Sequence, residues 1–240
     1  MNEIEIQKDY YERTAAQYDD MHLHRDDEQY FALSYLSGMI EFLQITSILD
    51  IGSGTGRVIR DLKRTYPHLR VVGIEPVEAL REIGYSQGLA ASELVAGDGN
   101  SLQYEAGDFD LVCAFGVLHH IRNPEVTVAE MLRVSGKAIF ISDANNFGQG
   151  GWLSRTIKQS INFFRLWPLA NFVKTRGKVY AITEGDGVAY SYSLFTNYRL
   201  IRAACKSVHL LNTLDAGVNL YRTAPHVALL GLKKQLSKPS

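Results

Sequence analysis

Short apolar runs alternate with amphipathic segments between residues 47 and 141 of this chain. After the first run, apolar side chains recur at spacings of three and four, at Ile59, Leu62 and Tyr66, which is the period of a helix. The runs that read as strands are 45–49, 70–75, 94–98, 109–115 and 137–142. Strands that alternate with helices favour a parallel sheet covered on both faces, so the pattern predicts an α/β fold.

The pattern also predicts elements on either side of this core. Residues 123–133 read as a helix that starts at Asn123, and residues 198–204 read as another. Residues 208–211 and 226–232 read as a closing pair of strands. We expect Val126, Ala129 and Leu132 to form the buried face of the first of these helices. The chain therefore divides into a helical cap (1–46), a core (47–144), a lid insertion (145–193), and a C-terminal helix with closing strands (194–240).

Composition fits one domain with an insertion, because 240 residues with 46% hydrophobic content can bury a full core. The net charge of −1 argues against a protein that coats nucleic acid. We expect Cys113 inside the fourth strand and Cys205 inside the late helix, as buried, reduced thiols of a cytoplasmic protein. The first residues show no signal-peptide pattern, and no apolar run is long enough to span a membrane.

A glycine-rich loop, Asp50-Ile51-Gly52-Ser53-Gly54-Thr55-Gly56, joins the first strand to the first helix. Glycine lets the backbone turn sharply and approach a ligand where a Cβ atom would clash. The helix N-terminus adds N–H groups that suit a carboxylate or phosphate. A dinucleotide-binding loop has its third glycine one residue later, so the spacing disfavours NAD(P).

Two acidic residues follow at the ends of the next strands. Glu75 ends the second strand, 19 residues beyond Gly56, where a carboxylate can accept both hydroxyl hydrogens of a ribose. Asp98 ends the third strand, where an adenine amino group could donate to it. With Asp50, this makes three acids at the ends of three strands. A shared ligand-binding role explains all three better than three unrelated solvated strand ends do.

Together with Gly116-Val117-Leu118-His119-His120 after the fourth strand, these residues resemble the class I S-adenosylmethionine (SAM)-dependent methyltransferases. The resemblance is to the small-molecule branch that includes ubiquinone-biosynthesis enzymes, and it covers Tyr10 to Ile141. One departure is Arg133-Val134-Ser135-Gly136, which lacks the usual Leu-Lys-Pro-Gly-Gly turn. The resemblance implies a Rossmann-like seven-stranded sheet with an antiparallel seventh strand, and SAM as the cofactor.

The resemblance also implies which residues hold SAM. Asp50 and the loop would take the methionine end, Glu75 the ribose, and Asp98 with Gly99 the adenine. The segment around Tyr18 resembles the N-terminal helix that closes over SAM, although a plain packing helix fits its pattern equally well. The full set of expected cofactor-binding residues is Asp50, Gly52, Ser53, Gly54, Gly56, Glu75, Pro76, Asp98, Gly99, Phe115, Leu118 and Tyr18.

His119 is the candidate catalytic residue, because a histidine can deprotonate a hydroxyl nucleophile near neutral pH. Successive residues on a helical turn point about 100° apart, so we expect at most one of His119 and His120 to face the substrate. A structural role for the pair is the favoured alternative, since the resembling family carries it in members with different chemistries. Asp143 and Asn146 follow the fifth strand, where a turn or a substrate contact is expected, and no metal ion.

The lid predicts the character of the acceptor. Residues 152–178 carry six cationic side chains and no acid, and their apolar residues fall at mostly helical spacing. This pattern suits an anionic or amphipathic acceptor, or a membrane surface. The alternative is a solvated basic face over a packed helix. The expected substrate contacts are Asp143, Asn146, Arg155 and Tyr192, and the lid is also a candidate dimer surface.

The function predicted is methylation of a small molecule, most simply at the oxygen of a hydroxylated natural product, saccharide or lipid-linked intermediate. The absence of Asn-Pro-Pro-Tyr or Asp-Pro-Pro-Tyr after the fourth strand disfavours methylation of a flipped DNA base, and nucleic acid is not the expected partner. Two alternatives stay open, an RNA methyltransferase and a SAM-binding regulatory protein without catalysis.

Overall fold

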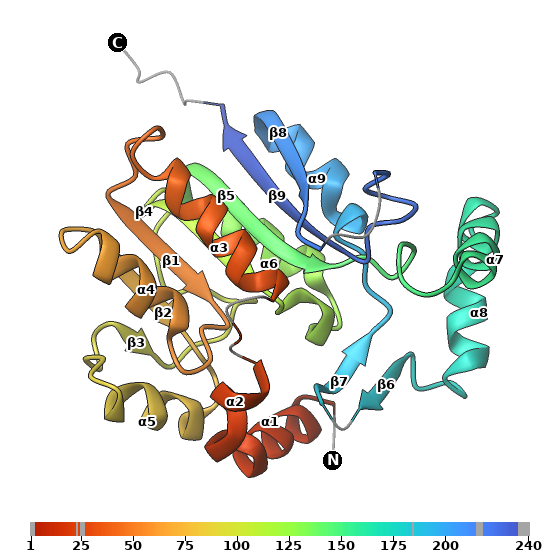
Figure 1. The fold of residues 1–240 in the computed structure, drawn as a ribbon, viewed down its shortest axis with the longest axis horizontal. Coiled ribbons are helices and arrows are strands. Elements are labelled where there is room, and N and C mark those ends of the chain that lie inside the picture. Colours follow the sequence, from red (N-terminus) through yellow and green to blue (C-terminus); the bar gives the residue numbers. More distant parts are fainter. Residues whose placement is uncertain (1–2, 23, 25–26, 184, 215–217, 235–240) are drawn as a thin grey trace.

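The computed structural model describes residues 3–22, 24, 27–183, 185–214 and 218–234. Its main sheet has seven strands in the order β3-β2-β1-β4-β5-β9-β8 (Figure 1). In that order they are β3 (Leu94–Val95), β2 (Arg70–Ile74), β1 (Ser47–Ile51), β4 (Phe109–Phe115), β5 (Ser135–Ala144), β9 (His226–Lys233) and β8 (Cys205–Asn212). The first five are parallel, and β9 is antiparallel to both neighbours. The predicted fold, including the antiparallel seventh strand, is confirmed.

Helices cover both faces of this sheet. Leu36 of α3 (Glu28–Met39) and Ile59 of α4 (Arg57–Thr65) belong to the apolar cluster on one face. Met131 of α6 (Pro124–Val134) and Ile201 of α9 (Tyr198–Ala204) belong to the cluster on the other. A further helix, α5 (Glu78–Ser86), contacts β3 at the sheet edge. Strands β2 and β3 lie on one side of β1, whereas β4, the next strand in the chain, pairs with the other side of β1. This reversal of strand order leaves a crevice at the carboxyl ends of β1 and β4.

Two sequence predictions about local packing are wrong. Leu132 is buried as predicted, but Val126 is 46% exposed and Ala129 is exposed, and the rest of the buried face of α6 is Pro124, Thr127, Val128, Met131 and Val134. Both stripes have helical spacing, and the contact with the sheet decides which one turns inward. Cys205 lies in β8 and not in the late helix, because the backbone becomes extended at that residue, with φ −104° and ψ 145°. Asn123 does precede α6, but its side chain makes no capping hydrogen bond.

The segments outside the sheet gather at its carboxyl edge and beyond one end (Figure 1). The N-terminal part forms α1 (Glu3–Thr14), η1 (Ala15–Gln17) and α2 (Tyr18–His22), and α1 contacts both α5 and β7. Residues 145–193 contain α7 (Trp152–Phe163), α8 (Trp167–Lys174), and the hairpin of β6 (Tyr180–Thr183) and β7 (Gly187–Tyr190). Short 3-10 turns η2 (Leu118–His120) and η3 (Leu194–Asn197) follow β4 and β7. No helix in the described ranges has the length and apolar character needed to cross a membrane.

Candidate cofactor and acceptor site

The glycine loop turns at the carboxyl end of β1 with all three glycines at positive φ. A Cβ atom on Gly52 would lie 2.5 Å from a methyl group of Val117, and one on Gly54 would lie 2.6 Å from the Tyr18 hydroxyl. Both distances are shorter than real Cβ contacts, so a side chain at either position would force Val117 or Tyr18 to shift. We call the loop surface formed by Gly52, Gly54 and Gly56 the glycine cradle. A ligand can approach its backbone closely, whereas side chains on the loop would clash.

Two acids lie buried beside this cradle. Asp50 accepts a hydrogen bond from the Ser53 hydroxyl at 2.7 Å, and burial raises the pKa of Asp50 to about 6. Glu75 accepts from the Gly54 N–H at 2.9 Å and from the Val77 N–H at 2.8 Å. Burial raises the pKa of Glu75 to about 7. Each carboxylate oxygen of Glu75 keeps a lone pair beyond these bonds, so it can still accept from a ribose hydroxyl.

The remaining predicted cofactor residues occupy varied surroundings. Asp98 is exposed and accepts from the backbone and side-chain amides of Asn100, at 2.9 and 3.0 Å. Gly99 is half-buried and Pro76 is exposed. Phe115 lines the pocket beside the loop, whereas Leu118 is fully buried in the core beneath it. These placements leave the roles assigned to the individual residues as predictions.

The pocket at the loop is a cavity of about 30 Å³. It is lined by Tyr18, Asp50, Gly52, Ser53, Thr55, Arg57, Val58 and Phe115. One water molecule needs about 10–15 Å³ of such space, so the cavity has room for only a few waters and is far smaller than a nucleoside ligand. Tyr18 of α2 fills the space above Gly54. The glycine cradle and the buried acids thus fit SAM chemically, provided that the Tyr18 side chain moves aside.

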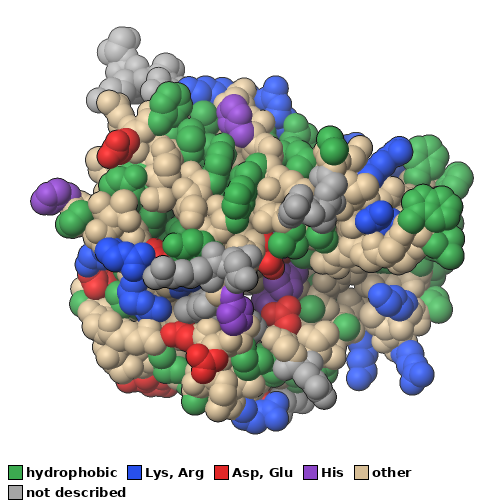
Figure 2. Space-filling view, viewed as in Figure 1, with side chains coloured by type: hydrophobic (Ala, Val, Ile, Leu, Met, Phe, Trp, Pro, Cys, Tyr) green, Lys and Arg blue, Asp and Glu red, His purple; other side chains and the backbone are tan. Residues whose placement is uncertain are grey.

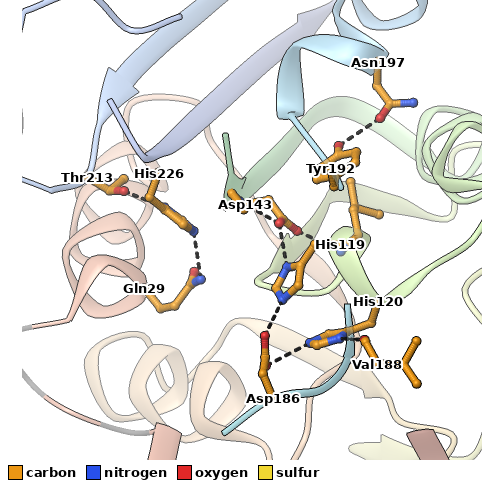
Figure 3. A network of polar contacts seen from close by, with 12 residues as sticks. Gln29, His119, His120, Asp143, Asp186, Val188, Tyr192, Asn197, Thr213 and His226 are labelled. Carbon is orange, nitrogen blue, oxygen red and sulfur yellow. Dashed lines mark hydrogen bonds and ion pairs between the residues drawn. The ribbon is translucent and has the colours of Figure 1, made fainter. Parts of the chain in front are cut away.

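A second polar cluster lies next to this pocket, around His119 (Figure 3). Its Nδ1 is 2.8 Å from Oδ1 of Asp143, which is fully buried at the end of β5. Its Nε2 is 3.1 Å from Oδ2 of Asp186, in the turn between β6 and β7. Burial opposes the charge on His119, but the carboxylates of Asp143 and Asp186 outweigh it and raise the pKa of His119 to about 10. In this arrangement the imidazole is protonated at neutral pH.

His120 meets the same carboxylate. Its Nε2 is 3.2 Å from Oδ1 of Asp186, its Nδ1 is 2.7 Å from the Val188 carbonyl oxygen, and the two histidine rings are 4.0 Å apart. The two side chains therefore converge on one carboxylate, and the expectation that at most one of them faces the substrate remains a prediction. The interval of about 100° applies to positions on a helix axis, whereas long side chains on a 3-10 turn can bend toward one charge.

Asp186 is one of the residues that sequence reasoning missed. The signal available was an acid between two glycines, Gly185-Asp186-Gly187, within the expected lid. His119, His120 and Asp186 offer three possible metal-ligand atoms within 4.8 Å of one another. The charged His119 ring already pairs with the Asp186 carboxylate, and the prediction that no metal ion is held stays a prediction.

Gln29 of α3 faces the cluster from the other side (Figure 3). Its Nε2 lies 3.1 Å from Nε2 of His226, whose Nδ1 lies 2.6 Å from the Thr213 hydroxyl. Among the described residues, Oε1 of Gln29 is buried without a hydrogen-bond partner. Turning the amide over would leave its nitrogen unpaired instead, so in either orientation one buried polar atom of Gln29 has no partner among the described residues. Neither Gln29 nor His226 was singled out from the sequence.

Of the four predicted substrate contacts, Asp143 alone touches the His119 cluster. Tyr192 is buried and donates its hydroxyl hydrogen to Asn197 at 2.8 Å. Asn146 donates to the Ser191 hydroxyl at 2.8 Å, and its carbonyl oxygen accepts from the ammonium group of Lys158. Arg155 lies on α7. Substrate contact by these three residues remains a prediction.

Residues 49–140 match a known protein family described as "Methyltransferase domain". Demethylmenaquinone methyltransferase of Thermotoga maritima is 37% identical over 70 residues, which are 29% of this chain and 30% of that protein. The matched curated relatives are covered over only 30–37% of their own length.

Solved structures resemble the chain over nearly its whole length. A SAM-dependent methyltransferase of Thermotoga maritima, described as a possible histamine N-methyltransferase, has a TM-score of 0.58 at 18% identity, covering 94% of this chain and 99% of that one. Magnesium protoporphyrin IX methyltransferase of Synechocystis, solved with bound S-adenosylhomocysteine, has a TM-score of 0.60 at 14% identity, covering 96% and 100%. At these identities the likeness establishes the shared fold.

Proposed function

We propose that this chain is a class I SAM-dependent methyltransferase that methylates a small molecule, most simply at a hydroxyl oxygen; the domain matched by residues 49–140 and the shared fold support this. The observation that carries the proposal is the pairing of two sites at one sheet edge. The glycine cradle with Glu75 suits the cofactor, and the His119–Asp143 pair next to it suits a hydroxyl nucleophile.

Asp50, Glu75 and the glycine loop would hold the cofactor in this proposal. When bound, SAM supplies an electrophilic methyl group on its sulfonium. Glu75 accepts from the ribose hydroxyls while it keeps its bonds to the Gly54 and Val77 N–H groups. Tyr18 moves off the cradle and closes the site from the N-terminal side, which excludes water. Exclusion of water and fixed orientation supply much of the rate in a displacement of this kind.

On the acceptor side, His119 takes the proton from the acceptor hydroxyl. Asp143, buried and bonded to Nδ1, fixes the orientation of the ring. Because the paired ring is already protonated, Asp186 must first turn away from Nε2 and the ring must release its Nε2 proton to water, which leaves Nε2 free to accept the proton of the acceptor hydroxyl. The acceptor then takes the place of Asp186, and its own polar groups can use the free amide atom of Gln29. Asp186, carried by the β6–β7 hairpin, therefore occupies the acceptor position at Nε2 of His119 until the acceptor displaces it.

The acceptor is anionic or amphipathic in this proposal. The lid between β5 and η3 carries the run of six cations without an acid, and Arg155 is one of them. A saccharide with an acidic group, or a lipid-linked intermediate, has the matching charge. We place the reaction in the cytoplasm, where the buried free thiols of Cys113 and Cys205 stay reduced.

The test is incubation of the purified chain with methyl-labelled SAM and fractionated cell extract. We expect label in a low-molecular-mass acceptor that binds to an anion-exchange resin, and none with a Glu75→Ala variant. Label in the RNA fraction would contradict the small-molecule proposal and support an RNA acceptor. Bound SAM with no labelled product from any fraction would support a regulatory protein.

A further inference from the structure

Helix α7 turns its apolar side away from the protein. Trp152 is 74% exposed and Phe163 is 81% exposed, at the two ends of the helix. At about 100° per residue, Trp152, Leu153, Ile157 and Phe163 fall within a sector of about 140°. None of the residues of α7 is buried. A helix on a water-soluble surface has the opposite orientation, with its apolar stripe on the core.

The polar side of α7 faces the body of the protein instead. The Lys158 ammonium group donates to the carbonyl oxygens of Asn146 and Gln149. The Gln159 amide donates to the Phe147 and Arg222 carbonyl oxygens, at 2.9 Å each, and Asn162 donates to the Tyr221 hydroxyl at 2.9 Å. These bonds set the rotation of the helix, so the exposed apolar side follows from specific contacts. The expected alternative, an apolar face packed inward beneath solvated cations, is wrong for α7.

Helix α8 and the connection to it extend the same surface. Phe164, Leu166, Leu169, Phe172 and Val173 are all more than half exposed. Trp167 fastens α8 to the body, because its indole N–H donates to the Ser191 hydroxyl at 3.0 Å and its ring lies 5.5 Å from that of Phe147. Figure 2 shows hydrophobic side chains gathered where α7 forms one end of the molecule, with Lys and Arg side chains beside them. We call this surface the α7–α8 face: Trp152, Leu153, Ile157, Phe163, Phe164, Leu166, Leu169, Phe172 and Val173.

The charge around the α7–α8 face selects among the surfaces that could cover it. Arg165 lies between the two helices, and Lys174, Arg176 and Lys178 lie at and beyond the end of α8, all exposed. No acid occurs in residues 152–178. A second copy of this chain meeting the face symmetrically would bring two sets of cations together without a counter-charge. A bilayer with anionic headgroups offers phosphates to the cations and an acyl boundary to the aromatic side chains.

We propose that the α7–α8 face docks this protein on the surface of a membrane that contains anionic phospholipid. Phe163, Phe164 and Leu166 enter the boundary between headgroups and acyl chains, and the cations lie at the headgroups. The β6–β7 hairpin, which carries Asp186, follows directly in the chain. Docking therefore brings the acceptor side of the site close to the membrane, where a lipid-linked acceptor would be presented. The docking itself does not depend on methyl transfer.

The experiment is flotation of the full chain with vesicles of phosphatidylcholine alone and with about 30% phosphatidylglycerol, at low and high salt. We expect binding to the anionic vesicles, weaker binding as salt rises, and little binding to the neutral ones. The double variant Phe163→Ser/Phe164→Ser should bind at least tenfold more weakly. The triple variant Arg165→Gln/Lys174→Gln/Arg176→Gln should lose about a hundredfold, because each cation near an anionic surface contributes a factor of about five.

Matched controls are Phe42→Ser, which removes a ring that is 77% exposed elsewhere, and the pair Arg199→Gln/Lys206→Gln, which removes two exposed cations outside the face. Both should bind vesicles as the parent does, and all variants should keep their affinity for SAM. The proposal is overturned if the parent does not float with anionic vesicles, or if the face variants float as well as the controls. It is also overturned if the aromatic pair abolishes self-association, measured by sedimentation velocity, and leaves vesicle binding unchanged.

Discussion

At the scale of single residues, burial and neighbouring charge decide what each titratable side chain can do. Glu75 and Asp50 are carboxylates withdrawn from water, and their pKa values are raised for that reason. His119 is also withdrawn from water, yet two carboxylates keep it charged. Desolvation disfavours the charged form of all three side chains. Only at His119 do carboxylates within hydrogen-bond distance outweigh it and keep the side chain charged.

Glu75 predicts a pH dependence of stability in the cofactor-free protein. Its pKa rises from an ordinary 4.5 to about 7 on folding, so the unfolded chain loses this proton first as pH increases. The free energy of unfolding should therefore fall between pH 4.5 and 7, by on the order of 3 kcal/mol in total. Denaturant unfolding across this range should show the slope in the parent, and Glu75→Gln should be flatter. Parallel curves would contradict the assignment.

Glu75 also predicts the pH dependence of SAM affinity. The ionised carboxylate is the form that accepts two ribose hydroxyls, and SAM should bind more tightly as pH rises from about 6 to 8. Calorimetry on the parent and on Glu75→Gln separates this effect from other groups, because the glutamine variant should be weaker by tenfold or more and nearly independent of pH.

His119 predicts a loss confined to the chemical step. His119→Ala should lower kcat by roughly 10²–10⁴-fold while the Kd for SAM stays unchanged. Asp143→Asn should share part of this loss, since the neutral amide holds the wrong ring tautomer. Near-normal turnover of a His119→Ala protein with an unchanged melting curve would instead support the structural role of the histidine pair.

At the scale of elements, the loop between β1 and α4 packs directly against the helix α2. Gly54 lies at φ +54° directly beneath the Tyr18 hydroxyl, so the loop backbone and the tyrosine ring share a contact surface. The packing of α2 therefore depends on the absence of a side chain in the loop. It follows that the loop, which is predicted to hold the cofactor, also supports the packing of α2.

The contact between the loop and α2 predicts different effects for two glycine substitutions. Gly54→Ala and Gly88→Ala both place a Cβ atom at positive φ, which costs about 1–2 kcal/mol. Gly88 has nothing within 4 Å of that atom, whereas Gly54 would push against Tyr18. We expect both variants to lose stability in thermal unfolding, and Gly54→Ala alone to lose SAM affinity, by tenfold or more. Equal SAM affinity in the two variants would show that the close approach at Gly54 has no part in binding.

At the scale of the whole molecule, α1 ties the two halves of the site together. The side-chain oxygen of Gln7 accepts from the Val188 N–H, and its amide nitrogen lies 3.2 Å from the Asp186 carbonyl oxygen and 3.3 Å from Nδ1 of His120. The helix that leads to Tyr18 is thereby joined to the hairpin that carries Asp186. Movement of Tyr18 for the cofactor and movement of Asp186 for the acceptor should therefore be coupled.

Gln7→Ala tests this coupling. Removing the amide should raise both the Kd for SAM and the KM for the acceptor, each by severalfold, because neither element is then held by the other. The neighbouring Lys8→Ala changes an exposed side chain of the same helix and should leave both constants unchanged. A Gln7→Ala effect on SAM alone would indicate that α1 packs over the cofactor without a link to the lid.

The sequence by itself determined the sheet and the grouping of the residues that are predicted to hold the cofactor. Strand ends and the glycine loop are local in the chain, and parallel strands bring their carboxyl ends to one edge, so Asp50, Gly54 and Glu75 could be placed together from their positions alone. The helical stripe of α4 was also predicted: Ile59 and Leu62 are buried, and Val58 is buried beside them.

The tertiary structure alone decided the acceptor side and the outer surface. Asp186 lies 67 residues from His119 in the chain, and no periodicity relates a hairpin turn to a 3-10 turn after another strand. The rotations of α6 and α7 were also undecided, because each helix offers two stripes of plausible spacing. For α7, hydrogen bonds from Lys158, Gln159 and Asn162 to distant carbonyl and hydroxyl groups choose the rotation that leaves the apolar stripe outside. Local pattern sets the period of an element, whereas its orientation depends on partners that are remote in sequence.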